Sequence, residues 1–176
     1  VATLGANTTH TYTINDNDPP TVAFSATTSN ASESTTSVTI PVILSSAYAN
    51  TVTVNYSVTG GTATGSGTDY TLAAGTLTFT SGVTSQDISF TVLNDTLSEA
   101  NETIIVTLAS PTVATLGTNT VHTYTIENDD TAPTVGFAAT ASSSGDESST
   151  SRNVEVTLSA ASGQTVTVTV TDTTGV

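Results

Sequence analysis

The stretch "GTLTFTSGVTSQDISFTVLNDTLSEANETIIVTL" (residues 75–108) contains three alternating or β-branched runs separated by turn residues. Such alternation indicates strands that bury one face. Similar runs flank the stretch, and no segment has an apolar stripe at helical spacing. The sequence predicts strands at residues 21–24, 38–44, 51–58, 76–79, 87–92, 103–108 and 122–126. Pro41 predicts an edge position or a bulge in the second of them. The expected fold is all-β, an immunoglobulin-like antiparallel sandwich.

The composition supports this fold class and narrows the range of partners. Thr makes up about a quarter of the residues, and β-branched side chains favour strands. The net charge of −14 argues against nucleic acid and anionic membranes as partners. The chain has no Cys, which excludes disulfides and thiol chemistry. No apolar run approaches the roughly 18 residues that span a bilayer, so we expect no membrane insertion.

The chain also repeats itself. "VATLGANTTHTYTINDND" (1–18) returns as "VATLGTNTVHTYTIENDD" (113–130), and "LSSAYANTVTV" (44–54) resembles "LSAASGQTVTV" (158–168). One repeat is thus about 113 residues, an ordinary size for a sandwich domain. We expect residues 1–18 to be the last strand of one repeat, 19–130 a complete repeat, and 131–176 the start of another. Neighbouring repeats of the same chain or adjacent filament subunits would then complete the partial ones.

The acidic residues are expected to gather at one end of the sandwich. If successive strands alternate in direction, four chain segments meet there, and the opposite loops (45–50, 80–86 and 110–121) contain no acid. The acids at this end are Glu33, Asp69, Asp95, Glu99, Glu102, Asp129 and Asp130. Neighbouring carboxylates repel one another, and Arg152 is the only Lys or Arg available for salt bridges. Calcium suits such oxygen ligands, whereas zinc and copper favour His or Cys. The alternative is a solvated acidic rim that keeps the protein soluble.

Other candidate residues have simpler interpretations. His10 and His122 are repeat equivalents, for which we expect a structural role. Asp69 suits a hydrogen bond that fixes a turn at least as well as it suits a metal. We expect core positions rather than a carbohydrate platform for the aromatic side chains Tyr12, Tyr70, Phe79, Phe90 and Tyr124. The chain lacks Cys and a Gly-x-Ser-x-Gly elbow, and no cleft is evident, so we do not expect an enzyme.

The complete repeat and both partial ones resemble the Calx-beta domains of sodium–calcium exchangers and large bacterial surface proteins, with the signature in residues 60–108. The resemblance includes the pair Asp69–Tyr70, the acid-rich loop before "ETIIVTL" and the closing "IENDD" (126–130). It implies calcium ligands at Glu33, Asp95, Glu99, Glu102, Asp129 and Asp130, with equivalents in the partial repeats at Asp16, Asp18 and Glu147. Gly60, Asn94 and Asn128 stand where other members carry acids. Less charge implies one or two Ca²⁺ ions rather than a crowded cluster.

Two functions fit this interpretation. The first is a structural, calcium-binding module of a long extracellular filament or adhesin stalk, with calcium stiffening the joints between repeats. The second is a calcium-sensing regulatory domain of a larger membrane-associated protein. Near-identical copies favour the first, because a stalk gains length from each copy. We therefore expect an extracellular or cell-surface location, with a tip ligand that the sequence does not identify.

Overall fold

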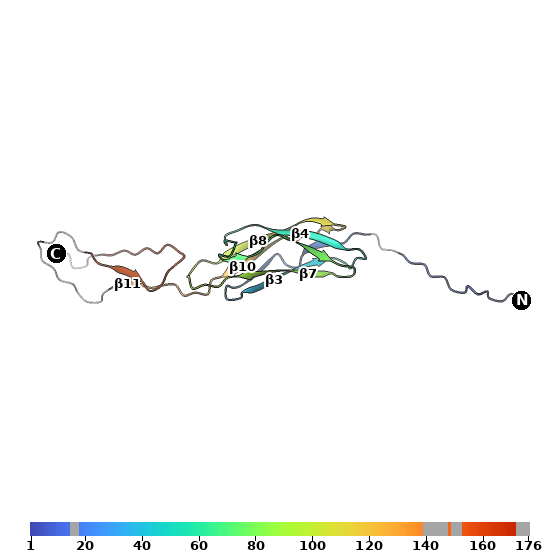
Figure 1. Cartoon of the computed structure of the whole chain (residues 1–176), viewed down its shortest axis with the longest axis horizontal. Coiled ribbons are helices and arrows are strands. Elements are labelled where there is room, and N and C mark those ends of the chain that lie inside the picture. Colours follow the sequence, from blue (N-terminus) through green and yellow to red (C-terminus); the bar gives the residue numbers. More distant parts are fainter. Residues whose placement is uncertain (15–17, 139–147, 149–152, 172–176) are drawn as a thin grey trace.

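Two five-stranded sheets pack face to face in the computed structural model, which describes residues 1–14, 18–138, 148 and 153–171 (Figure 1). The first sheet has the order β5 (Tyr70–Thr71), β7 (Ser85–Val92), β3 (Ser37–Leu44), β1 (Thr21–Phe24) and β9 (Thr115–Leu116). The second has the order β2 (Thr28–Ser32), β10 (Val121–Glu127), β8 (Glu102–Thr112), β4 (Val52–Gly61) and β6 (Gly75–Phe79). The all-β sandwich predicted from the sequence is confirmed.

The core lies between the sheets and follows the alternation of the strands. In β3, Val38, Ile40, Val42 and Leu44 are buried and the residues between them are exposed. Strand β7 alternates in the same way and pairs with β3 without a register shift. Each fully buried aliphatic or aromatic side chain contributes about 1.5–3 kcal/mol relative to exposure. The alternation therefore fixes which face of each sheet points inward.

All seven predicted strands are present, as β1, β3, β4, β6, β7, β8 and β10. The first has the predicted bounds, β4 begins one residue later and ends three residues later than predicted, and the other five extend beyond their predicted bounds. Three short strands, β2, β5 and β9, fall in segments predicted to be loops. Strand β2 reads "TSNAS", which has no apolar alternation, because it forms by parallel pairing with the edge of β10. It carries the chain from one sheet to the other after β1.

The expectation for Pro41 is wrong, because β3 is an inner strand with a regular register. The ring is tolerated because β1 ends at Phe24. Pro41 O accepts a hydrogen bond from the N–H of Ser25 at 3.0 Å, and the N–H that proline lacks would face this segment beyond the end of β1. The missing donor therefore removes no bond of the regular ladder.

His122 has the structural role that the sequence predicted. It is buried against the ring of Phe24, with ring centroids 5.4 Å apart. Its Nδ1 lies 2.8 Å from the carbonyl oxygen of Ala26, and its Nε2 lies 2.8 Å from Ser29 Oγ. A carbonyl oxygen only accepts, so Nδ1 donates, and in the neutral imidazole Nε2 then accepts from the hydroxyl. His122 thus ties β10 to the segment between β1 and β2.

The predicted aromatic core positions are confirmed for Tyr70, Phe79, Phe90 and Tyr124, all of which are buried. The prediction is wrong for Tyr12, which is 80% exposed. Residues 1–14 form no strand and extend away from the sandwich at one end of the molecule (Figure 1). Tyr12 therefore has no sheet to pack against in a single chain.

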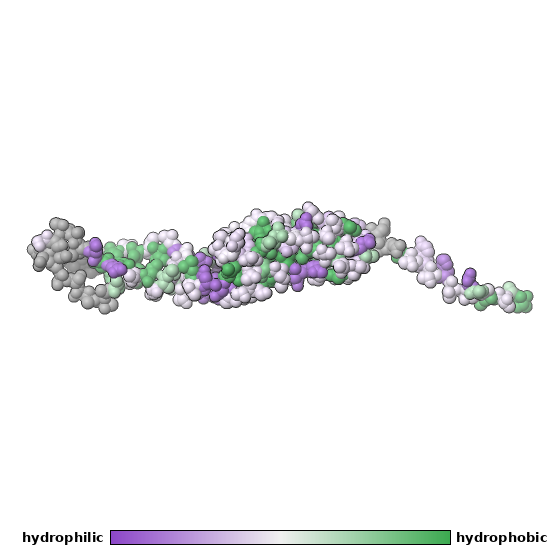
Figure 2. All heavy atoms as spheres, viewed as in Figure 1, coloured by the Kyte–Doolittle hydropathy of each residue, from purple (hydrophilic) through white to green (hydrophobic). Residues whose placement is uncertain are grey.

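A third, two-stranded sheet lies beyond the other end of the sandwich (Figure 1). It consists of β11 (Val135–Phe137) and β12 (Val156–Leu158), which are antiparallel. Apolar side chains lie open on the surface of this segment (Figure 2). No membrane-spanning helix is found among the described residues.

Candidate metal centre

The acids converge on one end of the sandwich, as the alternation of the strands predicted. They lie in the turn after β2, in the β4–β5 loop (62–69), in the β7–β8 loop (93–101), at the start of β8 and after β10. Oxygen atoms of six carboxylates form two close groups, Glu33 with Asp129 and Asp130, and Asp69 with Glu99 and Glu102. The hydrophobic core beneath the loops holds their ends in place.

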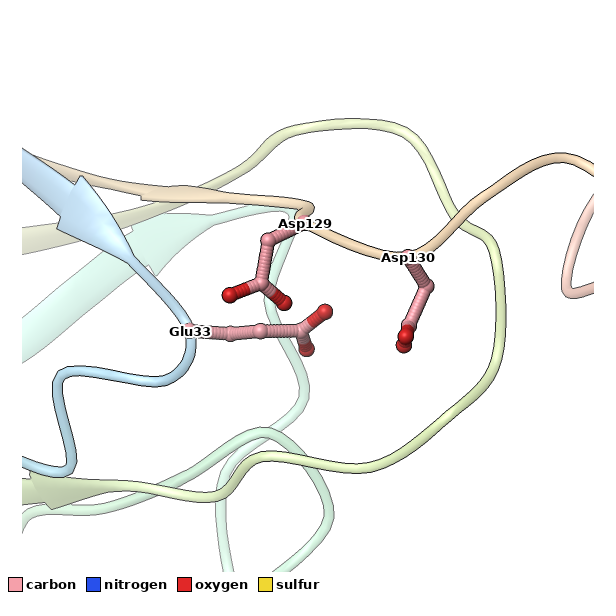
Figure 3. Close-up of side chains that lie close together, drawn as sticks. All are labelled: Glu33, Asp129 and Asp130. Atoms are coloured by element: carbon pink, nitrogen blue, oxygen red, sulfur yellow. The ribbon is translucent and has the colours of Figure 1, made fainter.

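In the first group, one carboxylate oxygen each from Glu33, Asp129 and Asp130 lies within 4.8 Å of the others. The Glu33 side chain extends from the turn after β2 into the space between the two aspartates (Figure 3). Glu33 is only 6% exposed, and its Oε1 has no hydrogen-bond partner among the described residues. The same holds for Oδ2 of Asp130. A buried carboxylate oxygen without a partner is costly, so this group is suited to a cation.

The pKa shifts in this group also indicate that it is suited to a cation. Burial raises the pKa of Glu33, and repulsion from Asp130 and Asp129 adds to the rise. Hydrogen bonds from the hydroxyls of Ser32 and Ser34 lower the pKa of Asp129. The hydrogen bonds thus favour the ionised form of Asp129, whereas burial and repulsion disfavour the ionised form of Glu33.

The second group, Asp69, Glu99 and Glu102, also has carboxylate oxygens within 4.8 Å of one another. Burial raises the pKa of Glu102 to about 7, together with its hydrogen bond to Asp69 and repulsion from Asp69 and Glu99. Burial and repulsion from Asp95 and Asp69 also raise the pKa of Glu99. Burial and repulsion thus disfavour the ionised forms of Glu99 and Glu102, which a nearby positive charge would stabilise.

Local hydrogen bonds hold the acidic loops in place. Asp69 Oδ2 accepts the N–H of Thr64 at 2.5 Å, so this side chain fixes its turn while belonging to the second group. Asp95 Oδ1 accepts the N–H of Leu97 at 2.6 Å, a turn that asparagine and aspartate often make. Both loops therefore present carboxylates from turns that those same carboxylates stabilise.

Asn128 links the segments of the centre. Its Oδ1 accepts the N–H of Glu99 at 2.8 Å, and its Nδ2 donates to the carbonyl oxygen of Asp130 at 2.9 Å. Its main-chain N–H donates to Asn101 Oδ1 at 3.2 Å. With its amide oxygen used in this way, Asn128 positions the β7–β8 loop against the segment after β10.

A small cavity joins the two groups. Its acidic and amide lining comes from Glu33, Asp69, Asp95, Glu99, Glu102 and Asn128. The space inside is about 10 Å³, room for about one water-sized sphere. The donors around it are oxygens, with no nitrogen or sulfur ligand, which is the donor set that calcium prefers. The residues present therefore fit a Ca²⁺ ion.

The structure brings together all six residues of the complete repeat that the sequence proposed as ligands. Asp95 lines the cavity without joining either close group. Asp69 joins the second group and also makes the turn-fixing hydrogen bond, the two roles between which the sequence left it open. The alternation of the strands already placed it at this end. Asp18 is exposed just before β1, at the opposite end of the sandwich. Asp16 and Glu147 lie outside the described residues.

Known structures share this architecture. The chain superposes on the apo-form Calx CBD1 domain with a TM-score of 0.60 and 24% identity, covering 64% of this chain and 100% of that one. It also superposes on the calcium binding domain CBD12 of CALX1.1, with a TM-score of 0.59 and 25% identity. That match covers 67% of this chain and 50% of the other, so it spans half of that structure.

Sequence comparison gives the family. A search of curated protein sequences found no match. Residues 15–130, which are more than half of the chain and contain both carboxylate groups, match the model of the Calx-beta domain family. The all-β sandwich and its structural neighbours agree with this match. The chain therefore belongs to the Calx-beta domain family.

Proposed function

We propose that this protein is a calcium-binding structural module of a long extracellular filament or adhesin stalk. The observation that carries the proposal is the meeting of two carboxylate groups around one small cavity, in a chain with a single Lys or Arg. A solvated acidic rim would leave its carboxylates in water, whereas Glu33 is buried with an unpartnered oxygen. Calcium binding in a related sandwich, CBD12 of CALX1.1, is consistent with this proposal.

The residues divide the task of holding the ion. Glu33, Asp129 and Asp130 would hold one side of the site, and Glu99, Glu102 and Asp95 the other. We add Asp69 to this set, because its carboxylate shares the second group with Glu99 and Glu102. When bound, the ion supplies the positive charge that the chain itself lacks. Five of these seven carboxylates line the small cavity, and Asp129 and Asp130 lie close to Glu33. Such a set suits one or two ions, since each Ca²⁺ takes six to eight oxygens.

The same site adjoins the joint to the next segment. Residues 131–134 alone separate Asp130 from β11. Across this joint, the N–H of Gly163 donates to the carbonyl oxygen of Ser98 at 3.1 Å. A Cβ at Gly163 would lie 2.5 Å from Glu99 Oε1, so the next segment closely approaches a proposed ligand. An ion that fixes the β7–β8 loop would thereby fix the direction in which the chain leaves the sandwich.

Calorimetric titration with Ca²⁺ tests the ligand assignment. The double variant Glu99→Gln and Glu102→Gln should bind calcium at least about tenfold more weakly, because two charges leave the site. Asp87→Asn is the matched control, since Asp87 is exposed within β7 and belongs to neither carboxylate group. It should titrate like the parent. Equal titration of the double variant and the parent would show that the assignment is wrong.

Small-angle scattering tests the mechanical role separately. Chelation should leave the sandwich folded and broaden the distribution of overall dimensions, because the segment after Asp130 gains freedom. At a calcium concentration that saturates the parent, the scattering of the double variant should respond less to chelation than that of the parent. If the parent binds calcium but its scattering does not respond to chelation, calcium binding stands and the stiffening of the joint is refuted.

A further inference from the structure

The segment after the sandwich repeats part of the sandwich core without covering it. Val135 and Phe137 of β11 pair with Leu158 and Val156 of β12, in the register in which β1 pairs with β3. The equivalent residues in β1, Val22 and Phe24, are 0% and 1% exposed. Val135 and Phe137 are 44% and 56% exposed. The described residues of this segment thus pair as in the sandwich, while their apolar side chains stay exposed.

These exposed residues line a groove. It has a volume of about 350 Å³, and its apolar lining comes from Val135, Phe137, Val156, Val168 and Val170. The apolar surface of this segment is visible beyond the end of the sandwich in Figure 2. The outer edge of β11 is also open, because the described sheet contains only β11 and β12. An open strand edge beside an apolar groove is a site for an added strand.

Within the sandwich, a specific segment covers the corresponding edge of β1. Residues 115–119 run parallel to β1, with Thr115 opposite Thr21 and Leu116 opposite Val22. The N–H of Gly117 donates to the carbonyl oxygen of Val22 at 2.9 Å. The flanking bonds of this pairing are Thr115 N–H to Pro20 O at 3.1 Å and Phe24 N–H to Asn119 O at 2.8 Å. Strand β10 follows and buries His122 against Phe24.

Residues 1–14 carry the same sequence as residues 113–126, apart from Ala6 and Thr9. They are exposed in the single chain, with Tyr12 80% and Ile14 84% exposed. Their equivalents in the sandwich, Tyr124 and Ile126, are 2% and 6% exposed. The chain thus contains a second copy of the covering segment, and this copy covers nothing. It lies at the end of the molecule opposite to β11, so it does not reach the groove of its own chain (Figure 1).

We propose that residues 3–7 of a second copy of this chain bind the open edge of β11, parallel to it and in the register of β9 on β1. Gly5 N–H would donate to Val135 O, and Phe137 N–H to Asn7 O. His10 and Tyr12 would follow over the groove as His122 and Tyr124 do in the sandwich. Donor and acceptor surfaces differ and lie at opposite ends, so the contact is heterologous and propagates head to tail into a filament. The proposal does not depend on calcium.

Sedimentation of the full chain over a range of concentrations tests the association. We expect species heavier than the 17.7 kDa monomer to grow with concentration. Gly5→Pro removes the N–H that points toward β11 and should abolish this growth. Ala6→Pro is the matched control, because alternate N–H groups of the strand point away, and it should associate like the parent. A single 17.7 kDa species at every concentration, or equal association of both variants, would overturn the proposal.

Disulfide cross-linking tests the register, since the chain has no native Cys. A Thr3→Cys chain mixed with a Thr134→Cys chain should form the mixed disulfide, because these residues correspond to the pair Thr115 and Thr21. Gly136→Cys lies two residues further along and should cross-link poorly to Thr3→Cys. Cross-linking of Thr134→Cys to itself in preference would indicate symmetric pairing of two grooves, which contradicts the proposal.

Discussion

The calcium-free sandwich should become more stable when Glu102 loses its charge. Glu102 begins β8, pairs with Ile126 of β10 and has a pKa raised to about 7 by burial and by its contacts with Asp69 and Glu99. In Glu102→Gln, the amide occupies a similar volume and can still donate to Asp69. It carries no charge to bury. The substitution therefore removes a repulsion and keeps the packing.

The raised pKa sets the magnitude and the pH window. An acid with a pKa of 4.5 in the unfolded chain and about 7 in the folded one holds its proton longer in the folded state. The stability of the calcium-free parent should then fall as the pH rises from about 4.5 to about 7, and change little through this group above that range. The shift corresponds to about 3.4 kcal/mol at most, and partial exposure of Glu102 to water lowers the expectation to about 1–3 kcal/mol.

Urea unfolding in the presence of chelator measures this effect. The chain has no Trp, so far-ultraviolet circular dichroism can follow the loss of the sheets. At pH 8, Glu102→Gln should unfold with a free energy about 1–3 kcal/mol higher than that of the parent, and at pH 4.5 the two should nearly coincide. Asp87→Asn controls for the change in net charge and should show no such gain.

Calcium should reduce the difference in free energy of unfolding between Glu102→Gln and the parent. At a concentration one hundred times its Kd, calcium stabilises the parent by about 2.7 kcal/mol, and a variant that binds tenfold more weakly gains about 1.4 kcal/mol. For a tenfold loss of affinity, the gap between the two proteins should therefore shrink by about 1.3 kcal/mol when calcium is added. A variant that is no more stable than the parent at pH 8 in chelator would refute the argument from burial and repulsion.

Three further outcomes are expected. His122→Ala should lower the free energy of unfolding by about 2–4 kcal/mol in denaturant titrations, through a cavity and an unpaired carbonyl group, and leave calcium affinity unchanged in calorimetry. Asp69→Asn keeps an acceptor for the N–H of Thr64 and removes one charge, so calorimetry should show weaker calcium binding by a protein with parental circular dichroism. Chelation should increase proteolytic cleavage within residues 127–134 by several-fold, with the sandwich core intact by mass spectrometry, and unchanged cleavage would contradict the role of calcium at the joint.

The features that follow from strand alternation could be predicted from the sequence. Every second residue is apolar and buried in β3, and in β7 from Ile88 onward, so this alternation identified both strands. The same alternation of direction predicted that Glu33, Glu99 and Asp129 would meet, although they are far apart in the chain. These features could be predicted because side chains on a strand alternate between the two faces of the sheet, so an alternating sequence shows which residues are buried.

Other features depend on pairing between segments that are distant in the sequence, and the local sequence of each segment does not show this pairing. Strand β2 has no apolar alternation and forms because the edge of β10 offers hydrogen bonds. The prediction of an edge or a bulge at Pro41 failed because the local sequence does not show that β1 ends before it reaches Pro41. The sequence also did not predict the structural role of Asn128, because an asparagine among acids was interpreted as a weaker calcium ligand. Its amide instead bonds to Glu99 and Asp130, a contact that only the folded loops create.

The two ends of the sandwich have different proposed roles, and the hydrophobic core lies between them. The acid-bearing loops add little to the core, so they can carry charges that destabilise the calcium-free fold. Their end of the sandwich is also where the chain leaves toward β11, with Gly163 close to Glu99. At the other end, the exposed copy of the β9–β10 sequence precedes β1. If both proposals hold, each copy would receive a strand beyond its calcium-bearing end and donate one from the other, which gives the assembly a single direction.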